Sequence, residues 1–177
     1  FSMEQAVQLG AGGEALAAYA LAEDKNSEDS SKDSWAQHYG PVEVEDGVTL
    51  EAQIGDEQGK FNLNTLLRRD GTPDPDAVKV LRRLLELSDL EPRWASLIID
   101  WIDPNNQPEA DGGEDSLYLS QTPPHRAGNL LLTSVSELQQ LPGFTLEMYR
   151  KLLPHVTALP PEAQKINVCT ADGVVLD

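Results

Sequence analysis

Apolar positions near the start of the chain recur at intervals of three and four, which predicts a helix over residues 1–22. The apolar stripe is narrow and consists mostly of small residues: Met3, Ala6, Leu9, Gly13, Leu16 and Ala20. Each glycine in a free helix costs about 1 kcal/mol relative to alanine. We therefore expect this helix to need a neighbour that packs close to its backbone.

The pattern changes to strict alternation after a polar stretch at residues 23–34, which contains no apolar residue and predicts a surface linker. Residues 42–45 alternate apolar with acidic side chains, and an Asp-Gly pair at residues 46–47 suits a two-residue hairpin turn. Residues 48–54 alternate in the same way, and residues 60–63 predict a third short strand. We expect a small antiparallel meander that covers the first helix.

Helical signals dominate residues 64–160. One helix is predicted to begin at Pro75, because Asp74 before it is a good cap, and another begins at Trp94. Two short helices joined by the turn LPGF at residues 141–144 follow, and residues 166–169 predict a final strand. A helical block between strands predicts an α+β protein in which a helical domain is inserted into a sheet domain.

The charge balance narrows the classes of partner. The sequence contains thirteen Lys and Arg residues and thirty Asp and Glu residues, which gives a net charge of -17. Nucleic acid and anionic lipid surfaces call for clustered basic residues, so both are disfavoured as ligands. Cys169 is the single cysteine, which leaves no internal disulfide, and no apolar run of about 20 residues suits a membrane span.

An acidic loop follows the Trp94 helix, and no Lys or Arg lies between Arg93 and Arg126. Calcium takes six to eight oxygen ligands from carboxylates, amides and carbonyls. Such oxygens are offered by Asp103, Asn105, Asn106, Gln107, Glu109, Asp111, Glu114 and Asp115. The loop is no EF-hand, because Pro108 stands where that motif requires glycine. A calcium site and a solvated acidic loop both stay open.

Enzymatic motifs are missing from the sequence. It contains no His-Glu-x-x-His, no Gly-x-Ser-x-Gly and no phosphate-binding Gly-Lys-Ser/Thr loop. Asp100 and Asp103 end a predicted helix, where an acid–base pair is conceivable, but nothing around them predicts the separated pKa values that such a pair needs. We therefore predict a protein that is not an enzyme.

One alternative function is a nucleic-acid-binding module. The LPGF turn at residues 141–144 resembles the hairpin of helix-hairpin-helix elements, whose backbone N–H groups bind phosphate. Only Arg150 and Lys151 follow that hairpin, so the acidic chain argues against this reading.

Seven segments resemble, in order, the K-type minor pseudopilins of the type II secretion system (the GspK family). They are GKFNLN (59–64), LIIDWID (97–103), GGEDxxY (112–118), TSVSEL (133–138), LPGF (141–144), YxxLxP (149–154) and INV (166–168). The resemblance implies a pilin-like helix packed on an antiparallel sheet, with a large helical domain inserted. It implies three segments: a pilin-like helix and sheet at residues 1–66, the inserted helical domain at 67–165, and a return strand of the pilin-like domain at 166–177.

The resemblance also implies a function. Such proteins assemble with I-type and J-type minor pseudopilins at the tip of the periplasmic pseudopilus of Gram-negative bacteria, with secreted proteins as further candidate partners. An inner-membrane anchor and further C-terminal sequence are expected outside these residues. The family's calcium, carried over by position, favours four ligands: Asp103, Asp111, Glu114 and Asp115.

Overall fold

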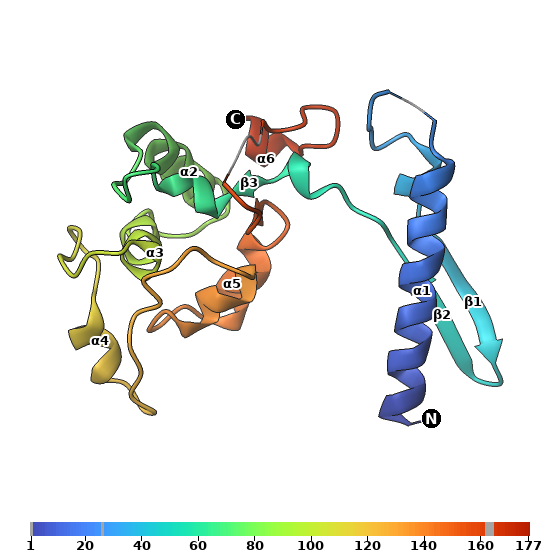
Figure 1. Ribbon diagram of the computed structural model, residues 1–177, viewed down its shortest axis with the longest axis horizontal. Helices are drawn as coiled ribbons and strands as arrows, with labels where there is room; N and C mark the ends of the chain where they lie inside the picture. The colour runs from blue at the N-terminus through green and yellow to red at the C-terminus, as the bar shows by residue number, and fades with distance from the viewer. Residues whose placement is uncertain (1, 26, 162–164) are drawn as a thin grey trace. The chain divides into compact units, whose positions relative to one another are not determined.

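The computed structural model describes residues 2–25, 27–161 and 165–177, and it divides the chain into two units, Phe1–Asp56 and Glu57–Asp177. The first unit contains a long helix and a β-hairpin (Figure 1): α1 (Met3–Glu23), the 3-10 helix η1 (Ser34–Ala36), β1 (Tyr39–Glu45) and β2 (Val48–Ala52). No helix in the described ranges is both long enough and apolar enough to cross a membrane.

Helix α1 confirms the prediction for residues 1–22, although residue 1 lies outside the described residues, as does residue 26 of the predicted linker. Ser2 caps the helix and Gln5 completes the capping box: the Gln5 N–H donates to Ser2 Oγ, and the Ser2 N–H donates to Gln5 Oε1. No residue of α1 is buried. Leu9, Gly13 and Ala20 of the apolar stripe are half-buried, whereas Met3 and Leu16 are 85% and 66% exposed, so the stripe is only partly covered.

The hairpin is also confirmed. Strands β1 and β2 are antiparallel, with Val42 opposite Leu50, and Gly47 supplies the positive φ of the turn at 73°. Gln8 of α1 and Val44 of β1 line one small surface hollow, so the helix lies along the hairpin. The first unit is therefore a helix beside a two-stranded sheet.

A strand forms within the predicted residues 60–63, but its predicted place in the antiparallel meander is wrong. Strand β3 (Phe61–Asn62) pairs in parallel with β4 (Val156–Thr157), inside the second unit. Phe61 and Asn62 are both buried, at 5% and 4% exposure. A strand covered on both faces suits a parallel pair in a core better than the half-exposed edge of a hairpin.

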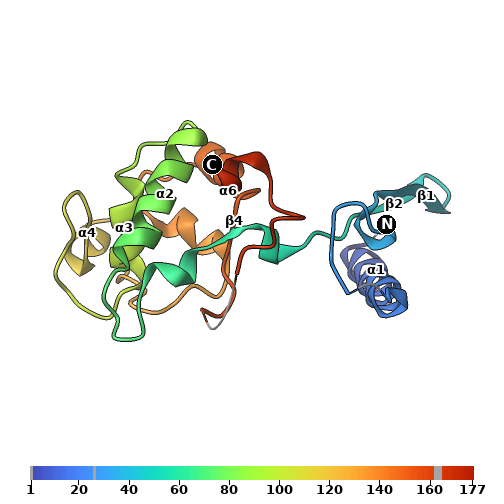
Figure 2. The same cartoon turned by 90° about the horizontal axis from the view of Figure 1, so that it is seen from above.

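The second unit is mostly helical (Figures 1 and 2). Besides β3 and β4 it contains η2 (Glu57–Gly59), η3 (Leu63–Leu66), α2 (Pro75–Leu87), α3 (Trp94–Ile102), α4 (Asp115–Leu119), η4 (Val135–Gln140), α5 (Leu146–Leu152) and α6 (Gly173–Leu176). The helices predicted from Pro75 and Trp94 are confirmed. The element after the Ser134–Glu137 capping box is a 3-10 helix.

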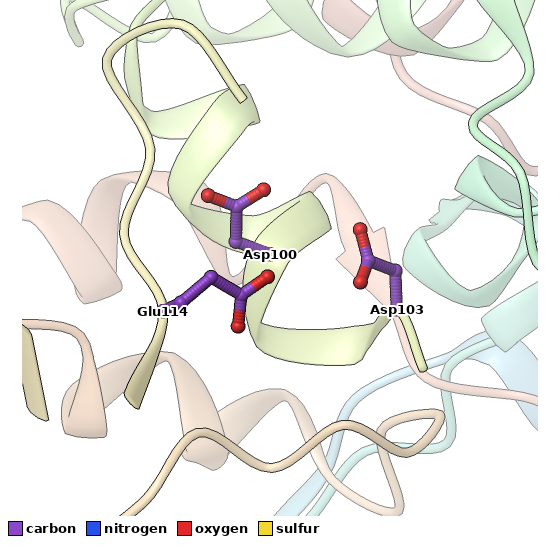
Figure 3. Close-up of side chains that lie close together, drawn as sticks. All are labelled: Asp100, Asp103 and Glu114. Carbon is purple, nitrogen blue, oxygen red and sulfur yellow. The ribbon is translucent and has the colours of Figure 1, made fainter. Parts of the chain in front are cut away.

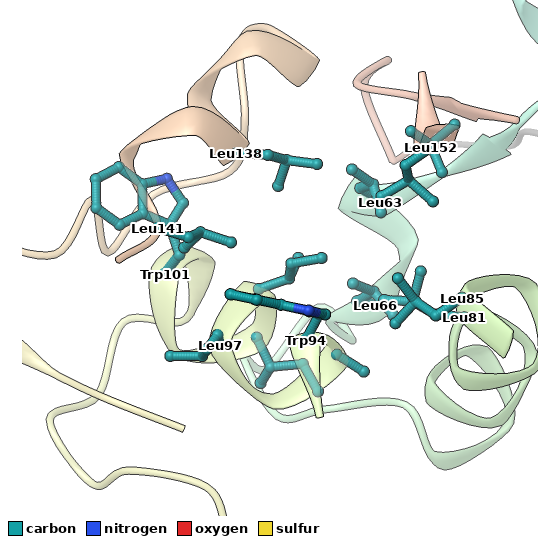
Figure 4. Packing of buried hydrophobic residues seen from close by; sticks show 14 of the residues in the cluster. Leu63, Leu66, Leu81, Leu85, Trp94, Leu97, Trp101, Leu138, Leu141 and Leu152 are labelled. Carbon is teal, nitrogen blue, oxygen red and sulfur yellow. The ribbon is translucent and has the colours of Figure 1, made fainter. Parts of the chain in front are cut away.

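Helix α3 is the centre of this unit, because all nine of its residues are buried. Leucines from distant parts of the chain surround it (Figure 4). The Trp94 ring meets Phe144 edge to face, with centroids 5.1 Å apart. Gly143 holds the LPGF turn at a φ of 83°, and Phe144 beside it is buried. The predicted two-helix corner therefore packs its turn against α3.

The predicted strand at residues 166–169 is wrong. The chain there forms turns, and the Asn167 N–H donates to the Gln58 carbonyl at 2.9 Å. Asp172 then caps the short α6, whose Val175 reaches the core. Residues 57–66 and 166–177 thus belong to the helical unit rather than to a sheet domain, while insertion into a larger sheet stays a prediction.

The cap of α2 yields a testable prediction. Asp74 Oδ1 accepts hydrogen bonds from the N–H groups of Asp76 and Ala77. We expect Asp74→Ala to lower the free energy of unfolding by about 1 kcal/mol, measured by urea denaturation. Asp76→Ala removes an acidic side chain from the same turn that does not cap the helix. It should lower the free energy of unfolding by only about 0.3–0.5 kcal/mol. Equal losses in both variants would contradict the capping role.

Candidate metal centre

Three acidic side chains meet at the carboxyl end of α3 (Figure 3). Asp100 lies in the last turn of α3, Asp103 is its C-terminal cap, and Glu114 is the N-terminal cap of α4. One oxygen from each lies within 4.8 Å of the others. Asp100 and Asp103 are 0% exposed and Glu114 is 5% exposed. We refer to these three residues as the carboxylate cluster.

Local sequence explains the arrangement. Asp100 and Asp103 are three apart, so they lie on one side of the helix end. The acidic loop is then drawn back onto Asp100, whose carboxylate accepts from the Glu109 N–H at 3.1 Å and from the Gly113 N–H at 2.6 Å. These backbone bonds bring Glu114, the next residue, to the cluster.

Gly112 permits this close approach. A Cβ atom at Gly112 would lie 2.0 Å from Asp100 Oδ2, a distance that side chains do not adopt. The Gly112 N–H also donates to the Glu109 carbonyl at 2.9 Å, which closes the turn before the cluster. The glycine is therefore required by contact with the carboxylate.

Several oxygens of the cluster lack a hydrogen-bond donor among the described residues. Asp103 Oδ1 accepts from the Asn105 N–H, whereas Asp103 Oδ2 and both oxygens of Glu114 are buried without a hydrogen-bond partner. Burial without compensation is costly for a carboxylate. An oxygen-seeking cation would compensate all three oxygens at once, so the donor set fits a hard divalent ion such as calcium.

The charges in the cluster are consistent with this fit. Burial raises the pKa of Asp100 and of Asp103. Burial, followed by the negative charges of Asp100, Asp103 and Asp115, raises the pKa of Glu114 to about 7. Three carboxylates thus oppose one another's ionisation, and a bound cation would reverse that tendency.

The structure brings together only part of the predicted ligand set. Asp103 and Glu114 are in the cluster. Asp111 is exposed, with a φ of 66°, and lies outside it. Asp115 also lies outside: it pairs with Arg126 Nη1 at 3.0 Å and accepts from the Ala127 N–H at 3.0 Å. Asp115 therefore fixes the position of residues 126–127, which follow α4 in the chain.

Asp100 is the member that the predicted ligand set left out. Its signal was present in the sequence, since an Asp at the third position before Asp103 sits among Ile99, Trp101 and Ile102 in a helix that reads as core. A charged group at such a position must be compensated once the helix is buried. Which of these residues bind a metal stays a prediction.

Aromatic side chains border the cluster. The rings of Trp101 and Tyr118 lie 5.0 Å apart at an interplanar angle of 61°. Burial, followed by the charges of Asp100 and Glu114, raises the pKa of Tyr118 well above its usual range. Both rings are buried, and electrostatic interactions between carboxylates are stronger in such a low-dielectric setting.

In the presence of chelator, stability is expected to fall as pH rises from about 4.5 to about 7. Glu114 binds its proton more tightly in the folded chain, with a pKa raised from 4.5 to about 7. The stability that Glu114 contributes by holding this proton is complete below its unfolded pKa of 4.5. It is lost as pH rises through its folded pKa of about 7. We expect a loss of about 1–2 kcal/mol, measured by urea denaturation at about pH 4.5 and about pH 7.5.

The matched control is Glu114→Gln, which keeps the side-chain shape and removes the titrating group. We expect this variant to lose most of the pH dependence in that window. A metal-free chain whose stability rises with pH over the same range would show that Glu114 is not held protonated.

A long helix along an antiparallel hairpin, with a helical unit built around a buried α3, defines a pilin-like α+β protein that carries a helical domain. The family model described as "Type II secretion system (T2SS), protein K" matches residues 59–161. The chain therefore belongs to the type II secretion system protein K family.

Relatives agree with this assignment. The chain is 36% identical to type II secretion system protein K of Pseudomonas aeruginosa, over 98% of this chain and 55% of that protein. It is also 36% identical to protein K of Klebsiella pneumoniae, over 94% of this chain and 54% of that protein. The chain thus spans about half the length of these relatives.

A solved structure shows the same fold. The crystal structure of the GspK-GspI-GspJ complex from the type 2 secretion system of enterotoxigenic Escherichia coli contains a chain that matches with a TM-score of 0.80 and 30% sequence identity. The match covers 98% of this chain and 65% of that one. The α+β fold class predicted from the sequence is confirmed.

Proposed function

We propose that this chain is the periplasmic part of a minor pseudopilin without enzymatic activity. It assembles with an I-type and a J-type minor pseudopilin at the tip of the type II secretion pseudopilus, where it initiates or caps the fibre. Secreted proteins are further candidate contacts. As part of the same proposal, the protein is anchored in the inner membrane of a Gram-negative bacterium and exposes this chain to the periplasm.

One observation carries this proposal: nearly the whole chain matches a chain of a complex whose three components are GspK, GspI and GspJ. The exposed side of helix α1 adds a physical reason. Met3 and Val7 are 85% and 66% exposed, and because they are four residues apart they lie on one side of the helix. Neighbouring exposed apolar side chains are typical of a surface that another protein covers.

The proposal includes a structural calcium ion in the carboxylate cluster. Asp100, Asp103 and Glu114 would hold it through oxygens, and the ion would offset their mutual repulsion. Its effect is to hold in place the loop between α3 and α4, which is rich in polar residues and contains few apolar ones. The ion is assigned no role in catalysis.

Assembly is tested by mixing the chain with its cognate I-type and J-type proteins and measuring complex formation by gel filtration and calorimetry. The wild-type chain is expected to elute as a ternary complex. Val7→Glu places a charge beside Met3 on the exposed side of α1, and we expect it to weaken association at least about tenfold, a loss of about 1.4 kcal/mol.

The control is Val80→Glu, since Val80 is 44% exposed on α2 of the other unit. This variant should bind as the wild type does. Failure of the wild-type chain to form any complex would overturn the proposed assembly role. Equal weakening by both variants would remove α1 as the contact surface.

The described part of the chain offers little to the nucleic-acid alternative. Lys151, one of the two basic residues after the LPGF turn, lies 3.9 Å from Glu147. The acidic side chain of Glu147 so close to Lys151 lowers the attraction of this surface for phosphate. The proposal therefore rests on protein partners.

A further inference from the structure

A groove of about 680 Å³ lies in the helical unit, and none of the three residues of the carboxylate cluster is among its lining residues. Its apolar walls include Leu67, Ile102, Leu130 and Leu131, and Arg68 and Arg69 stand among the lining residues. Neither the family assignment nor the proposed contacts of α1 account for it. Its volume is in the range of sites that hold small ligands or short peptide segments.

The charge of this groove is opposite to that of the chain. Its lining contains two arginines and no Asp or Glu, in a protein with thirty acidic residues. Arg68 Nε lies 3.4 Å from Asp74 Oδ2, so its charge is partly satisfied. Arg69 forms no ion pair among the described residues and is exposed. Arg69 is therefore available to a carboxylate from another molecule.

The basic side of the groove is preformed. The Arg68 N–H donates to the Thr72 carbonyl at 2.8 Å and the Gly71 N–H donates to the Arg68 carbonyl at 2.9 Å, which closes a tight turn. Gly71 has a φ of 80°, and a Cβ there would lie 2.9 Å from Pro104 Cγ. The turn thus sits directly on the residue after Asp103, and little ordering is needed before a ligand binds.

The opposite side offers backbone groups. Leu130 and Leu131 are 74% and 39% exposed, and their peptide N–H and C=O groups make no hydrogen bond within the described part of the chain. The stretch is held at both ends, because the Asn129 N–H donates to the Trp101 carbonyl and the Leu132 N–H donates to Asn64 Oδ1, each at 2.8 Å. Such a segment suits pairing with an extended peptide.

We propose that this groove binds an extended peptide segment of a partner protein that carries an acidic side chain next to an apolar one. The acidic group pairs with Arg69, the apolar side chain packs on Leu131 and Leu67, and the peptide backbone pairs with Leu130 and Leu131. This combination of an apolar wall, a basic residue and unpaired backbone selects a peptide over a simple anion.

The probe is the blocked peptide acetyl-Val-Leu-Glu-Leu-Val-amide, titrated into the isotope-labelled 177-residue chain and followed by backbone NMR. We expect shifts confined to residues 67–71, 102–104 and 129–132, with a dissociation constant of about 0.1–1 mM. The same peptide with Gln in place of Glu should bind at least about fivefold more weakly, because it lacks the charge that pairs with Arg69.

The matched variants are Arg69→Glu and Arg82→Glu, which make the same charge change in the groove and on the exposed face of α2. Only Arg69→Glu should weaken the peptide, by about tenfold or more. No shifts at about 5 mM peptide, shifts centred elsewhere, or equal weakening by both variants would overturn the proposal. So would octanoate binding as tightly as the peptide, since that would define an amphiphile site.

Discussion

Addition of calcium to the metal-free chain is expected to raise its melting temperature by about 5–10 °C, and chelator should reverse the rise. A ligand at about 100 times its dissociation constant that binds only the folded state stabilises that state by about 2.7 kcal/mol. For a chain of this size each kcal/mol moves the midpoint by about 2–4 °C. The reason lies in Asp103 Oδ2 and the two carboxylate oxygens of Glu114, which are buried and have no hydrogen-bond donor within the described part of the chain.

Two matched substitutions in the same loop separate the carboxylate cluster from general acidity. Asp103→Asn removes a cluster charge and should abolish most of the calcium response. Asp111→Asn removes an exposed charge, and asparagine tolerates the positive φ at this position, so the response should persist. An unchanged melting temperature in the wild type would argue against any structural ion. Loss of the response in Asp111→Asn would restore that residue as a ligand.

Most of the helical unit could be predicted because its signals are local. Asp74 and Pro75 are the start of a helix by themselves, and the apolar run from Trp94 reads as a core helix that must end before Pro104. The hairpin follows from its Asp-Gly turn in the same way. Each of these elements needs only neighbouring residues to specify it.

The errors have one physical cause, which is that short strands depend on distant partners. Phe61–Asn62 looked like a continuation of the hairpin, but its partner is Val156–Thr157, almost a hundred residues later. Residues 166–169 have strand-like composition, yet hydrogen bonds to Gln58 and the Asp172 cap shape them into turns. Pairing over such separations is invisible to local patterns.

The acidic loop could be singled out from the sequence, but the side chains that meet there could not. Of the four ligands that the resemblance favoured, Asp103 and Glu114 lie in the carboxylate cluster, and their binding of a metal stays a prediction. Asp111 and Asp115 lie outside it, because composition does not reveal direction: Asp115 is turned toward Arg126. Asp100 enters the cluster since the loop folds back onto the helix, through hydrogen bonds from Glu109 and Gly113. Burial distinguishes these residues, and burial is a property of the fold.

Gly112→Ala is expected to lower the free energy of unfolding by about 3 kcal/mol and to weaken calcium binding at least about tenfold. The added methyl group would lie 2.0 Å from Asp100 Oδ2, so either the loop or the carboxylate must move. Movement of the loop would lengthen the bond from the Gly113 N–H to Asp100 and carry Glu114 away from the cluster. The substitution thus tests whether loop closure and the cluster are one structure.

Gly12→Ala is the matched control, because the same methyl group at Gly12 meets nothing within 4 Å. In the middle of α1 alanine is favoured over glycine by about 1 kcal/mol, so this variant should be neutral or more stable. Urea denaturation gives the stability of both variants, and a terbium luminescence titration gives their cation affinity. If Gly112→Ala kept the cation affinity of the wild type while losing stability, the contact with Asp100 would matter for packing alone. Loss of both together would tie the glycine, Asp100 and Glu114 into a single ion-binding unit.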